Sequence, residues 1–281
     1  MNFKNLRPES NYSSYPPYHT GEYLEEYFYA YYKKNKISFD KTGYTLIPVF
    51  WTNIYHTHEN INLVQPYLDS LPNDKYFTVS QHDDAVREVL PENTISFEAG
   101  GNGTGIPLPL ICSPLPQYET LEKDIFCSFV GSTTHNIRNQ IADLYGRDSS
   151  FVFVNKSWTL EVCNDDFNVF INTTRRSKFT LCPRGYGAQS FRLYEALQLE
   201  SVPVVVYDKR WFAFEDRIDW SSFCVLVHCN EIETIKDRLL QIDDSQYQSM
   251  LKSGKRIYSE YFTMKGMSEN ILKTLQTLSK I

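Results

Sequence analysis

The 281-residue sequence lacks any long apolar run. A membrane-spanning helix needs about 18 or more consecutive apolar residues, and no window of this chain approaches that length. The N-terminal stretch MNFKNLRPESNYSSYPPYHTGEY also lacks the apolar segment of a secretory signal peptide. The first absence argues against a membrane span, and both together predict a soluble, cytoplasmic protein.

The chain also has fewer positively charged than negatively charged residues. The formal net charge at pH 7 is −6, and no block of like charge marks a basic tail or a polybasic membrane anchor. Proteins that bind nucleic acids need a basic surface to contact the phosphates. The composition therefore argues against a general nucleic-acid-binding function.

A complete set of closely spaced metal ligands is missing as well. The six cysteines contain no Cys-x-x-Cys pair, and in a chain without an export signal they are expected to be reduced thiols. His56 and His58 form a His-x-His pair that is able to chelate zinc, but no third and fourth ligand follow at a diagnostic spacing. We therefore expect no metal site.

What the sequence does contain is a regular alternation of short apolar runs and helical patterns. The runs at 45–51, 76–81 and 94–99 have the length of buried strands, and a helical pattern at 60–71 lies between the first two. A helix-like stretch at 21–36 precedes them. Alternation of this kind indicates an α/β fold with a mainly parallel sheet.

A second series of strands and helices follows a proline-rich stretch at 105–124, which we interpret as a connection between domains. Its expected strands lie at 125–132, 150–155, 178–183, 202–207 and 223–229. We predict two domains, residues 1–115 and 116–255, which face a central cleft. A final helix at about 256–281 is expected to pack back on the first domain.

The stretch CPRGYGAQSFRLYEALQLESVPVVVYD, at 182–208, carries the first candidate chemistry. A strand that ends at Pro183, a loop with two glycines and a helix capped by Ser190 form an anion-binding arrangement, because the N-terminus of a helix carries partial positive charge. Arg184 and Arg192 would add donors that suit a diphosphate. Ligands of open α/β sheets collect at this end of the strands.

Arg192 and Glu195 lie three residues apart on one face of the predicted helix. An arginine for phosphate and a glutamate for ribose hydroxyls would together suit a nucleotide. The ordinary alternative is an intrahelical salt bridge. These two residues alone leave both interpretations open.

A longer pattern in this region resembles the core motif of the exostosin-like (GT47-like) glycosyltransferases. That pattern runs S-x-F-x-L-x-P-x-G, then S-x-R-x-x-E-A, then a V-P-V-I strand, an Asp and a D-W-x-x-F segment. The residues in register are Ser177, Phe179, Leu181, Pro183, Gly185, Ser190, Arg192, Glu195, Ala196, Pro203, Asp208, Asp219, Trp220 and Phe223. The chain departs from the family at 199–201, where Leu-Glu-Ser replaces the usual Gly-Cys pair.

The resemblance extends upstream in two segments. FCSFVGSTTHNIRNQI resembles the family's F-x-G…R segment through Gly131 and Arg138. DKYFTVSQHDDAV resembles its D-H-F-F-V-x-x-H-D segment through Val79, His82 and Asp83, among others. Coverage is therefore roughly residues 45 to 260, with the denser matches in the second half.

The resemblance implies a GT-B-type enzyme, built from two Rossmann-like domains, with the nucleotide-sugar donor mainly on the C-terminal one. The expected donor-binding residues are Arg138, Arg184, Gly185, Tyr186, Ser190, Phe191, Arg192 and Glu195. Family members mostly use UDP-sugars. The chain has no Asp-x-Asp pair, with which GT-A enzymes usually hold a divalent ion, so we expect no essential metal or other cofactor.

Inverting transfer needs a base that deprotonates the acceptor hydroxyl. Asp83 is our preferred base, and its alternative role is to cap a helix in AVREVL. His82 would orient Asp83, contact the sugar or be structural. Glu98 is a rival base beside the glycine-rich stretch 99–105, which either closes over the donor or forms a plain turn.

The predicted function is inverting transfer of a sugar, xylose as first choice, from a UDP-sugar to a hydroxyl of a glycan acceptor. His56, His58 and Glu59 are interpreted as a polar rim on the acceptor side. The alternative is a non-catalytic subunit that binds glycan or nucleotide and retains the fold. A compact form without a membrane anchor is expected of a virus- or microbe-encoded member, in the host cytoplasm if viral, and the oligomeric state is not predicted.

Overall fold

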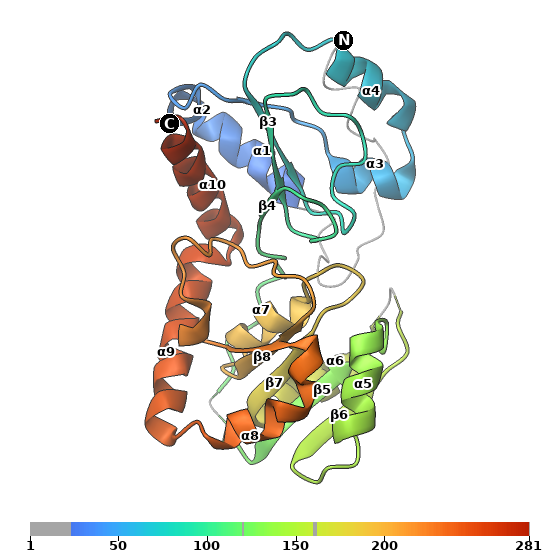
Figure 1. The fold of residues 1–281 in the computed structure, drawn as a ribbon, viewed down its shortest axis with the longest axis vertical. Helices are drawn as coiled ribbons and strands as arrows, with labels where there is room; N and C mark the ends of the chain where they lie inside the picture. Colours follow the sequence, from blue (N-terminus) through green and yellow to red (C-terminus); the bar gives the residue numbers. More distant parts are fainter. Residues whose placement is uncertain (1–23, 120, 160–161, 281) are drawn as a thin grey trace. The chain divides into compact units, whose positions relative to one another are not determined.

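The computed structural model describes residues 24–119, 121–159 and 162–280, so the arm expected at 1–20 lies outside the described residues. The chain divides into two compact units, which we call unit 1 (Met1–Ile111 with Tyr261–Ile281) and unit 2 (Cys112–Glu260). Each unit holds one parallel sheet with helices packed on it (Figure 1). The predicted α/β class with two mainly parallel sheets is confirmed.

The sheet of unit 1 has four parallel strands in sequential order. They are β1 (Thr45–Leu46), β2 (Tyr76–Ser80), β3 (Thr94–Glu98) and β4 (Ile106–Pro107). In the central pair, Tyr76 lies opposite Thr94 and Ser80 opposite Glu98. This register brings the carboxyl ends of β2 and β3 to the same edge, where the loops after Ser80 and Glu98 begin.

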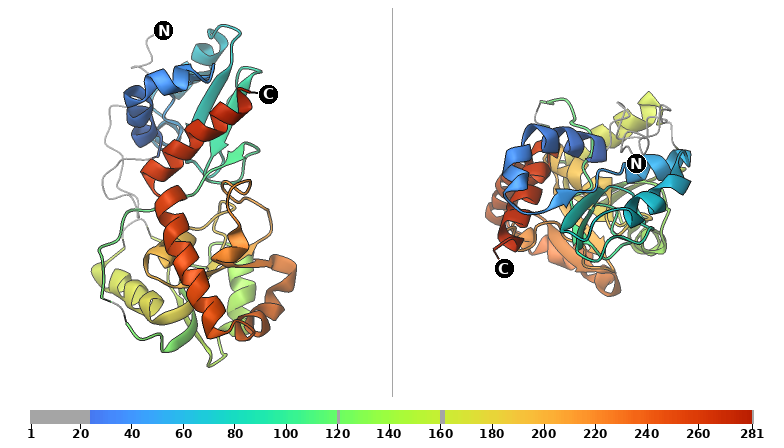
Figure 2. Two further views of the ribbon diagram at one scale, coloured as in Figure 1. Left: turned by 90° about the vertical axis from the view of Figure 1, so that its left-hand side faces the viewer. Right: turned by 90° about the horizontal axis from the view of Figure 1, so that it is seen from above.

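Helices cover both faces of this sheet because successive strand residues point to opposite sides. On one face, α3 (Trp51–Thr57) and α4 (Ile61–Asp69) pack on Tyr76, and Trp51 donates its indole N–H to Thr78 Oγ1 at 2.8 Å. On the other face, the Phe77 ring meets Phe28 and Phe39 from α1 (Leu24–Lys34) and α2 (Lys36–Asp40). The C-terminal α10 (Met264–Leu278) lies alongside α1 (Figure 2).

Two expectations for unit 1 are wrong. The run 45–51 forms a strand only at Thr45–Leu46, because Pro48 has no N–H for a strand ladder and Trp51 begins α3. No helix follows Asp83: residues 84–90 are irregular, and Ala85 adopts a left-handed φ of 58°. Asp83 therefore does not cap a helix in AVREVL.

The sheet of unit 2 has five parallel strands in the order β6-β5-β7-β8-β9. Their bounds are β5 (Ile125–Gly131), β6 (Phe151–Asn155), β7 (Ser177–Pro183), β8 (Val202–Tyr207) and β9 (Val225–His228). The first strand of this unit, β5, thus lies inside the sheet, with β6 on one side of it and β7 on the other. Winding reverses between β5 and β7, which makes their carboxyl ends a topological switch point.

Both faces of the unit 2 sheet are also covered. One face packs Val202, Val204 and Val206 against α5 (Asn136–Tyr145), the 3₁₀ segment η3 (Cys229–Thr234), α8 (Ile235–Leu240) and α9 (Asp244–Tyr261). On the opposite face, α6 (Asn164–Arg176) and α7 (Phe191–Gln198) pack on the sheet. The buried Val202–Val206 run confirms the prediction of a strand covered on both faces.

The helices of unit 2 depart from expectation in two places. The sequence interpretation gave no helix between 155 and 178, where α6 lies, and it gave one final helix where α9 and α10 are separate. Thr263 separates the two helices because it caps the N-terminus of α10. Its side chain accepts a hydrogen bond from the Gly266 N–H at 3.0 Å. All six cysteines are free, and four of them are buried.

Candidate functional site

The loop that follows β7 lies at the switch point of the unit 2 sheet. It runs over residues 184–190 and is closed by a hydrogen bond from the Gly185 N–H to the Gln189 carbonyl at 3.1 Å. Ser190 then caps α7, since its Oγ accepts from the Arg192 N–H at 3.3 Å. The predicted strand, glycine loop and capped helix are confirmed, and we call residues 184–190 the donor loop.

Arg138, in the first turn of α5, clamps this loop to the loop after β5. Its Nε donates to the Arg184 carbonyl and its Nη1 to the Ser132 carbonyl, both at 2.8 Å, while Nη2 donates to the Pro183 carbonyl at 3.2 Å. A Cβ on Gly185 would lie 3.3 Å from Nη2, so the glycine gives the guanidinium room. Arg138 thus donates hydrogen bonds to backbone oxygens of both loops, and these bonds hold the two loops together.

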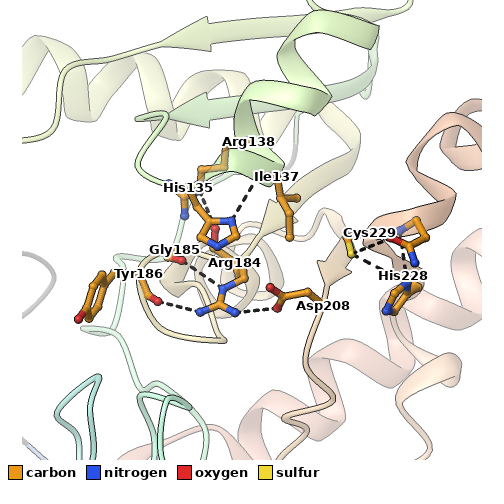
Figure 3. A network of polar contacts seen from close by, with 10 residues as sticks. His135, Ile137, Arg138, Arg184, Gly185, Tyr186, Asp208, His228 and Cys229 are labelled. Atoms are coloured by element: carbon orange, nitrogen blue, oxygen red, sulfur yellow. Dashed lines mark hydrogen bonds and ion pairs between the residues drawn. The ribbon is translucent and has the colours of Figure 1, made fainter.

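Arg184 is held in a fixed orientation by its own loop and by β8. Its Nη1 pairs with Asp208 Oδ1 at 2.7 Å and its Nη2 donates to the Tyr186 carbonyl at 2.8 Å (Figure 3). Burial works to raise the pKa of Asp208, but the hydrogen bond and charge of Arg184 lower it below its ordinary value. Asp208 is therefore an ionised partner that orients Arg184.

Tyr186 lies within the donor loop, and Phe191 directly follows it. The Tyr186 side chain is 63% exposed, and in Figure 3 its ring projects away from Arg184. Phe191 is half-buried at the first position of α7. An exposed aromatic ring beside an arginine is suited to pack on a planar or sugar ring of a ligand.

Arg192 and Glu195 form the intrahelical salt bridge that the sequence left as one of two interpretations. Arg192 Nη1 lies 2.8 Å from Glu195 Oε2, and the two side chains are only 19% and 15% exposed. The guanidinium also stacks on the Phe170 ring at 3.7 Å from its centroid. The two side chains thus form a partly buried ion pair in the first turns of α7. This arrangement is compatible with binding of a nucleotide as well as with a structural role.

His135 belongs to the same cluster, although its side chain was not among the predicted site residues. It caps α5 by accepting the Ile137 N–H at Nδ1, at 3.3 Å. Burial lowers the pKa of His135, and the charge of Arg184 lowers it further, so the ring is neutral near pH 7. Its position directly before a predicted helix, after two threonines, was the available signal.

In unit 1, His82 lies just beyond β2 and is held as a neutral ring. Its Nδ1 accepts the Asp84 N–H at 3.2 Å, and its ring packs against Tyr55 at 4.9 Å. Burial, with the charges of Arg87 and His56, lowers the pKa of His82 to about 4. With Nδ1 occupied as an acceptor, Nε2 carries the proton, so the ring is a donor rather than a base.

Asp83 is fixed through its backbone by the glycine-rich loop after β3. Its carbonyl accepts the Asn102 N–H at 3.0 Å, and Gly100 lies so close that an added Cβ would be 2.2 Å from the Asp83 Cα. The side chain is partly exposed. The structure therefore places Asp83 beside His82 at the carboxyl end of β2, on a tightly held backbone.

Glu98 is buried inside the loop that the sequence placed next to it. It is 4% exposed, and its two oxygens accept from Ser96 Oγ at 2.7 Å and from the Gly105 N–H at 3.0 Å. A Cβ on Gly103 would fall 2.0 Å from Oε2. The stretch 99–105 thus wraps around this carboxylate, and the carboxylate holds the loop in place.

The predicted polar rim is set by α3. His56 is exposed in its last turn, and His58 caps its C-terminus with a left-handed φ of 57°. Glu59 follows, with its N–H bound to Thr57 Oγ1 at 3.2 Å. Partial desolvation of its ring and the charge of the neighbouring His58 lower the pKa of His56, whose ring lies 5.9 Å from that of His82.

The described residues contain no group of three or more His, Cys, Asp or Glu side chains arranged to hold a metal ion. In the same ranges, no helix has both the length and the apolar character needed to cross a bilayer.

Residues 70–242 match the Exostosin GT47 domain, which is more than half of the chain. The chain belongs to this family. The matched range includes both the His82–Asp83 segment of unit 1 and the whole donor loop of unit 2. The resemblance to the exostosin-like glycosyltransferases is confirmed.

Curated relatives share parts of the exostosin domain. A probable glycosyltransferase of Arabidopsis thaliana is 38% identical over 162 residues, which are 58% of this chain and 29% of the relative. The Exostosin-1 homolog of Caenorhabditis elegans is 29% identical over 100 residues (35% and 26%). Ribitol-5-phosphate xylosyltransferase 1 of Homo sapiens is 27% identical over 89 residues (30% and 20%). The chain thus spans less than a third of the length of these relatives.

Among solved structures, similarity extends to TarM, with a TM-score of 0.43 and 12% identity over 77% of this chain and 58% of TarM. An α1,3-fucosyltransferase has a TM-score of 0.35 and 21% identity, over 55% of this chain and 46% of that enzyme. These values add nothing to the family assignment.

Proposed function

We propose that this exostosin-family chain is an inverting glycosyltransferase that moves a sugar from a UDP-sugar to a hydroxyl of a glycan acceptor. The observation that carries the proposal is the grouping of Arg184, Arg192 and Glu195 around the donor loop. That loop lies at the carboxyl end of β7, at the switch point where open parallel sheets bind their ligands.

Positive charge and side chains held in fixed orientations support a donor site here. Arg184, oriented by Asp208, and the capped N-terminus of α7 both favour a diphosphate, because they offer N–H donors and positive potential. Arg192 adds a cation in the first turn of α7, and Glu195 is suited to accept from ribose hydroxyls. Arg138 acts as a positioning residue, because its donors already bind carbonyl oxygens.

For the chemical step we propose Asp83 as the base. Its carboxylate accepts the proton of the acceptor hydroxyl, whose oxygen then bonds to the anomeric carbon while the bond from that carbon to the UDP oxygen breaks. His82 is a poor rival because its free nitrogen carries a proton and its pKa is about 4. Glu98 is a poor rival because both of its oxygens are bound inside a loop.

Xylose remains the first choice for the transferred sugar, supported by the match to a xylosyltransferase among the relatives. UDP-sugar is the proposed substrate, with no metal or other cofactor. The second candidate is a non-catalytic subunit, for which the intrahelical Arg192–Glu195 pair is the favouring observation.

A release assay separates the two. Purified protein is incubated with a panel of UDP-sugars that includes UDP-xylose, with and without glycan acceptors, and free UDP is measured. An enzyme releases UDP in proportion to acceptor, and wild type exceeds Asp83→Asn. A subunit without activity binds UDP-sugars, seen as a rise in melting temperature, but releases no UDP with any acceptor.

A further inference from the structure

A hollow of about 280 Å³ opens between the carboxyl ends of β5 and β6, beside the donor loop but separate from its arginines. Ser132, Thr133 and Thr134 line it from the loop after β5. Asn155, Ser157 and Trp158 line it from the segment after β6. The expected donor-binding residues include none of these six.

The frame of the hollow is held by the backbone. Gly131 and Asn155 are paired at the ends of the two strands, and the Lys156 N–H donates to the Gly131 carbonyl at 2.9 Å. On the other side, Arg138 Nη1 binds the Ser132 carbonyl. Because Arg138 also binds the carbonyls of Pro183 and Arg184, the hollow and the donor loop share one clamp.

The charge of the hollow favours a neutral ligand. Lys156 also lines it, but its ammonium forms an ion pair with Asp166 of α6. The remaining lining groups are hydroxyls, an amide and an indole. A phosphate or carboxylate would therefore find no uncommitted cation among these side chains, whereas hydroxyls and amides hydrogen-bond neutral polar ligands.

Trp158 supplies the apolar surface. Its side chain is 58% exposed, whereas Trp51, Trp211 and Trp220 are 0%, 5% and 3% exposed. A large exposed indole among hydroxyls suits a ring that has one C–H face and a rim of hydroxyl groups, because the indole stacks on that face while the rim is hydrogen-bonded. A pyranose has this shape.

We propose that this hollow is a carbohydrate subsite that takes one neutral pyranose ring, stacked on Trp158 and hydrogen-bonded by Thr133, Thr134 and Asn155. The inference rests on the proposed function, since it gives the sugar a place next to the donor loop. Two sources supply the same chemistry: the sugar of the UDP-sugar, or one unit of the glycan acceptor.

Trp158 itself provides the readout, because it is the one exposed indole among four tryptophans. The full chain is titrated with UDP, with a panel of UDP-sugars that includes UDP-xylose, and with neutral oligosaccharides, while tryptophan emission and its quenching by acrylamide are followed. We expect sugar-bearing ligands to shift the emission and protect it from acrylamide. Trp158→Phe should abolish the signal.

The three kinds of ligand distinguish a donor sugar from an acceptor sugar, and they also show which results would overturn the proposal. A response to a UDP-sugar but not to UDP assigns the ring to the donor, and a response to oligosaccharide alone assigns it to the acceptor. A full response to UDP alone would mean a nucleobase site and overturn the proposal. Silence of Trp158 toward every sugar in the panels would overturn it as well.

Variants measure the contribution to affinity. Trp158→Ala should weaken binding of the responding sugar ligand about tenfold or more, with UDP affinity unchanged, and Thr133→Val should weaken it less. Leu144→Ala, at an exposed leucine on α5 outside the hollow, is the matched control and should change neither. If wild type binds no UDP at all, the proposed function fails, while the oligosaccharide arm still decides the subsite.

Discussion

The three arginines around the donor loop divide their hydrogen-bonding capacity in different ways. Arg138 binds three backbone carbonyls, Arg184 pairs with Asp208 and a carbonyl of its own loop, and Arg192 pairs with Glu195 in the same helix. At the residue scale, Arg138 therefore clamps two loops, whereas Arg184 and Arg192 are the two cations to which we assign contacts with a ligand.

Asp83→Asn tests the proposed base. An asparagine keeps the size and the backbone contacts of this position but does not accept a proton, so turnover should fall about 10²–10⁴-fold while UDP affinity stays unchanged. Asp84→Asn is the control, because Asp84 is the neighbouring carboxylate, it pairs with Arg87 at 2.7 Å, and no catalytic role is proposed for it. Steady-state UDP release checks both, and full turnover by Asp83→Asn would place the base elsewhere.

Glu25→Gln tests a buried carboxyl in unit 1. Glu25 Oε1 accepts from Thr52 Oγ1 at 2.7 Å and from the Gln81 N–H at 3.0 Å, while Oε2 has no hydrogen-bond partner among the described residues. Burial raises the pKa of Glu25 above its ordinary value of 4.5, although these hydrogen bonds lower it. The folded state thus binds its proton more tightly than the unfolded state does.

The raised pKa of Glu25 makes its contribution to stability depend on pH. Stability from this group is fully present below pH 4.5 and is lost as pH rises through the folded pKa, because ionisation is easier in the unfolded chain. Glu25→Gln removes that loss, so its melting temperature should exceed wild type by roughly 3–6 °C at pH 8 and by less at pH 4. Glu92→Gln, at an exposed position, should show no such trend. An equal or lower melting temperature for Glu25→Gln at pH 8 would contradict the assignment.

The local structure around the donor loop was easier to predict from the sequence than the contacts that hold it in place. The cap at Ser190 and the run Arg184 to Glu195 follow from local spacing, so they were visible. The carbonyl partners of Arg138 were not, because they come from loops far away in the sequence. The packing of residues 103–105 around Glu98 was not visible for the same reason, since it is tertiary.

At the scale of elements, strands buried on both faces were the most predictable. The run Val202–Val206 is apolar throughout and forms β8 as expected. Helix α6 was missed because it is polar on average, and only Phe170, Ile171 and Thr174 are buried. Local backbone effects at Pro48 and Ala85 account for the strand that is too short and the helix that does not form.

Gly100→Ala tests the contact between the loop after β3 and the proposed base. The added Cβ would lie 2.2 Å from the Asp83 Cα and 2.4 Å from the His82 carbonyl oxygen, so the backbone must move. We expect a loss of about 2–3 kcal/mol in the free energy of unfolding, measured with urea, and a fall in turnover.

Gly254→Ala is the matched control for that change. Its Cβ would meet the Leu197 Cδ2 at 2.9 Å, which is the movable end of a side chain, so the cost should stay below about 1 kcal/mol. Equal behaviour of the two alanine variants would contradict the tight packing around Asp83.

At the scale of the whole molecule, two parallel α/β units share one chain whose surplus charge is negative. Arginines and a helix N-terminus gather at the switch point of unit 2. We therefore expect the wild-type protein to release UDP in excess EDTA at the same rate as without EDTA. Loss of activity that Mn²⁺ or Mg²⁺ restores would show that an ion neutralises the diphosphate instead.

The central claim is that unit 2 binds UDP at the donor loop, and calorimetric titration of UDP into wild type and Arg192→Ala tests it most directly. Loss of one charge-assisted contact of about 1.5–3 kcal/mol predicts a Kd raised roughly 10–100-fold in Arg192→Ala. Arg210→Ala, from an exposed ion pair in the same unit, should bind as wild type does. The same Kd for Arg192→Ala and wild type, or no UDP binding by either, would contradict the account.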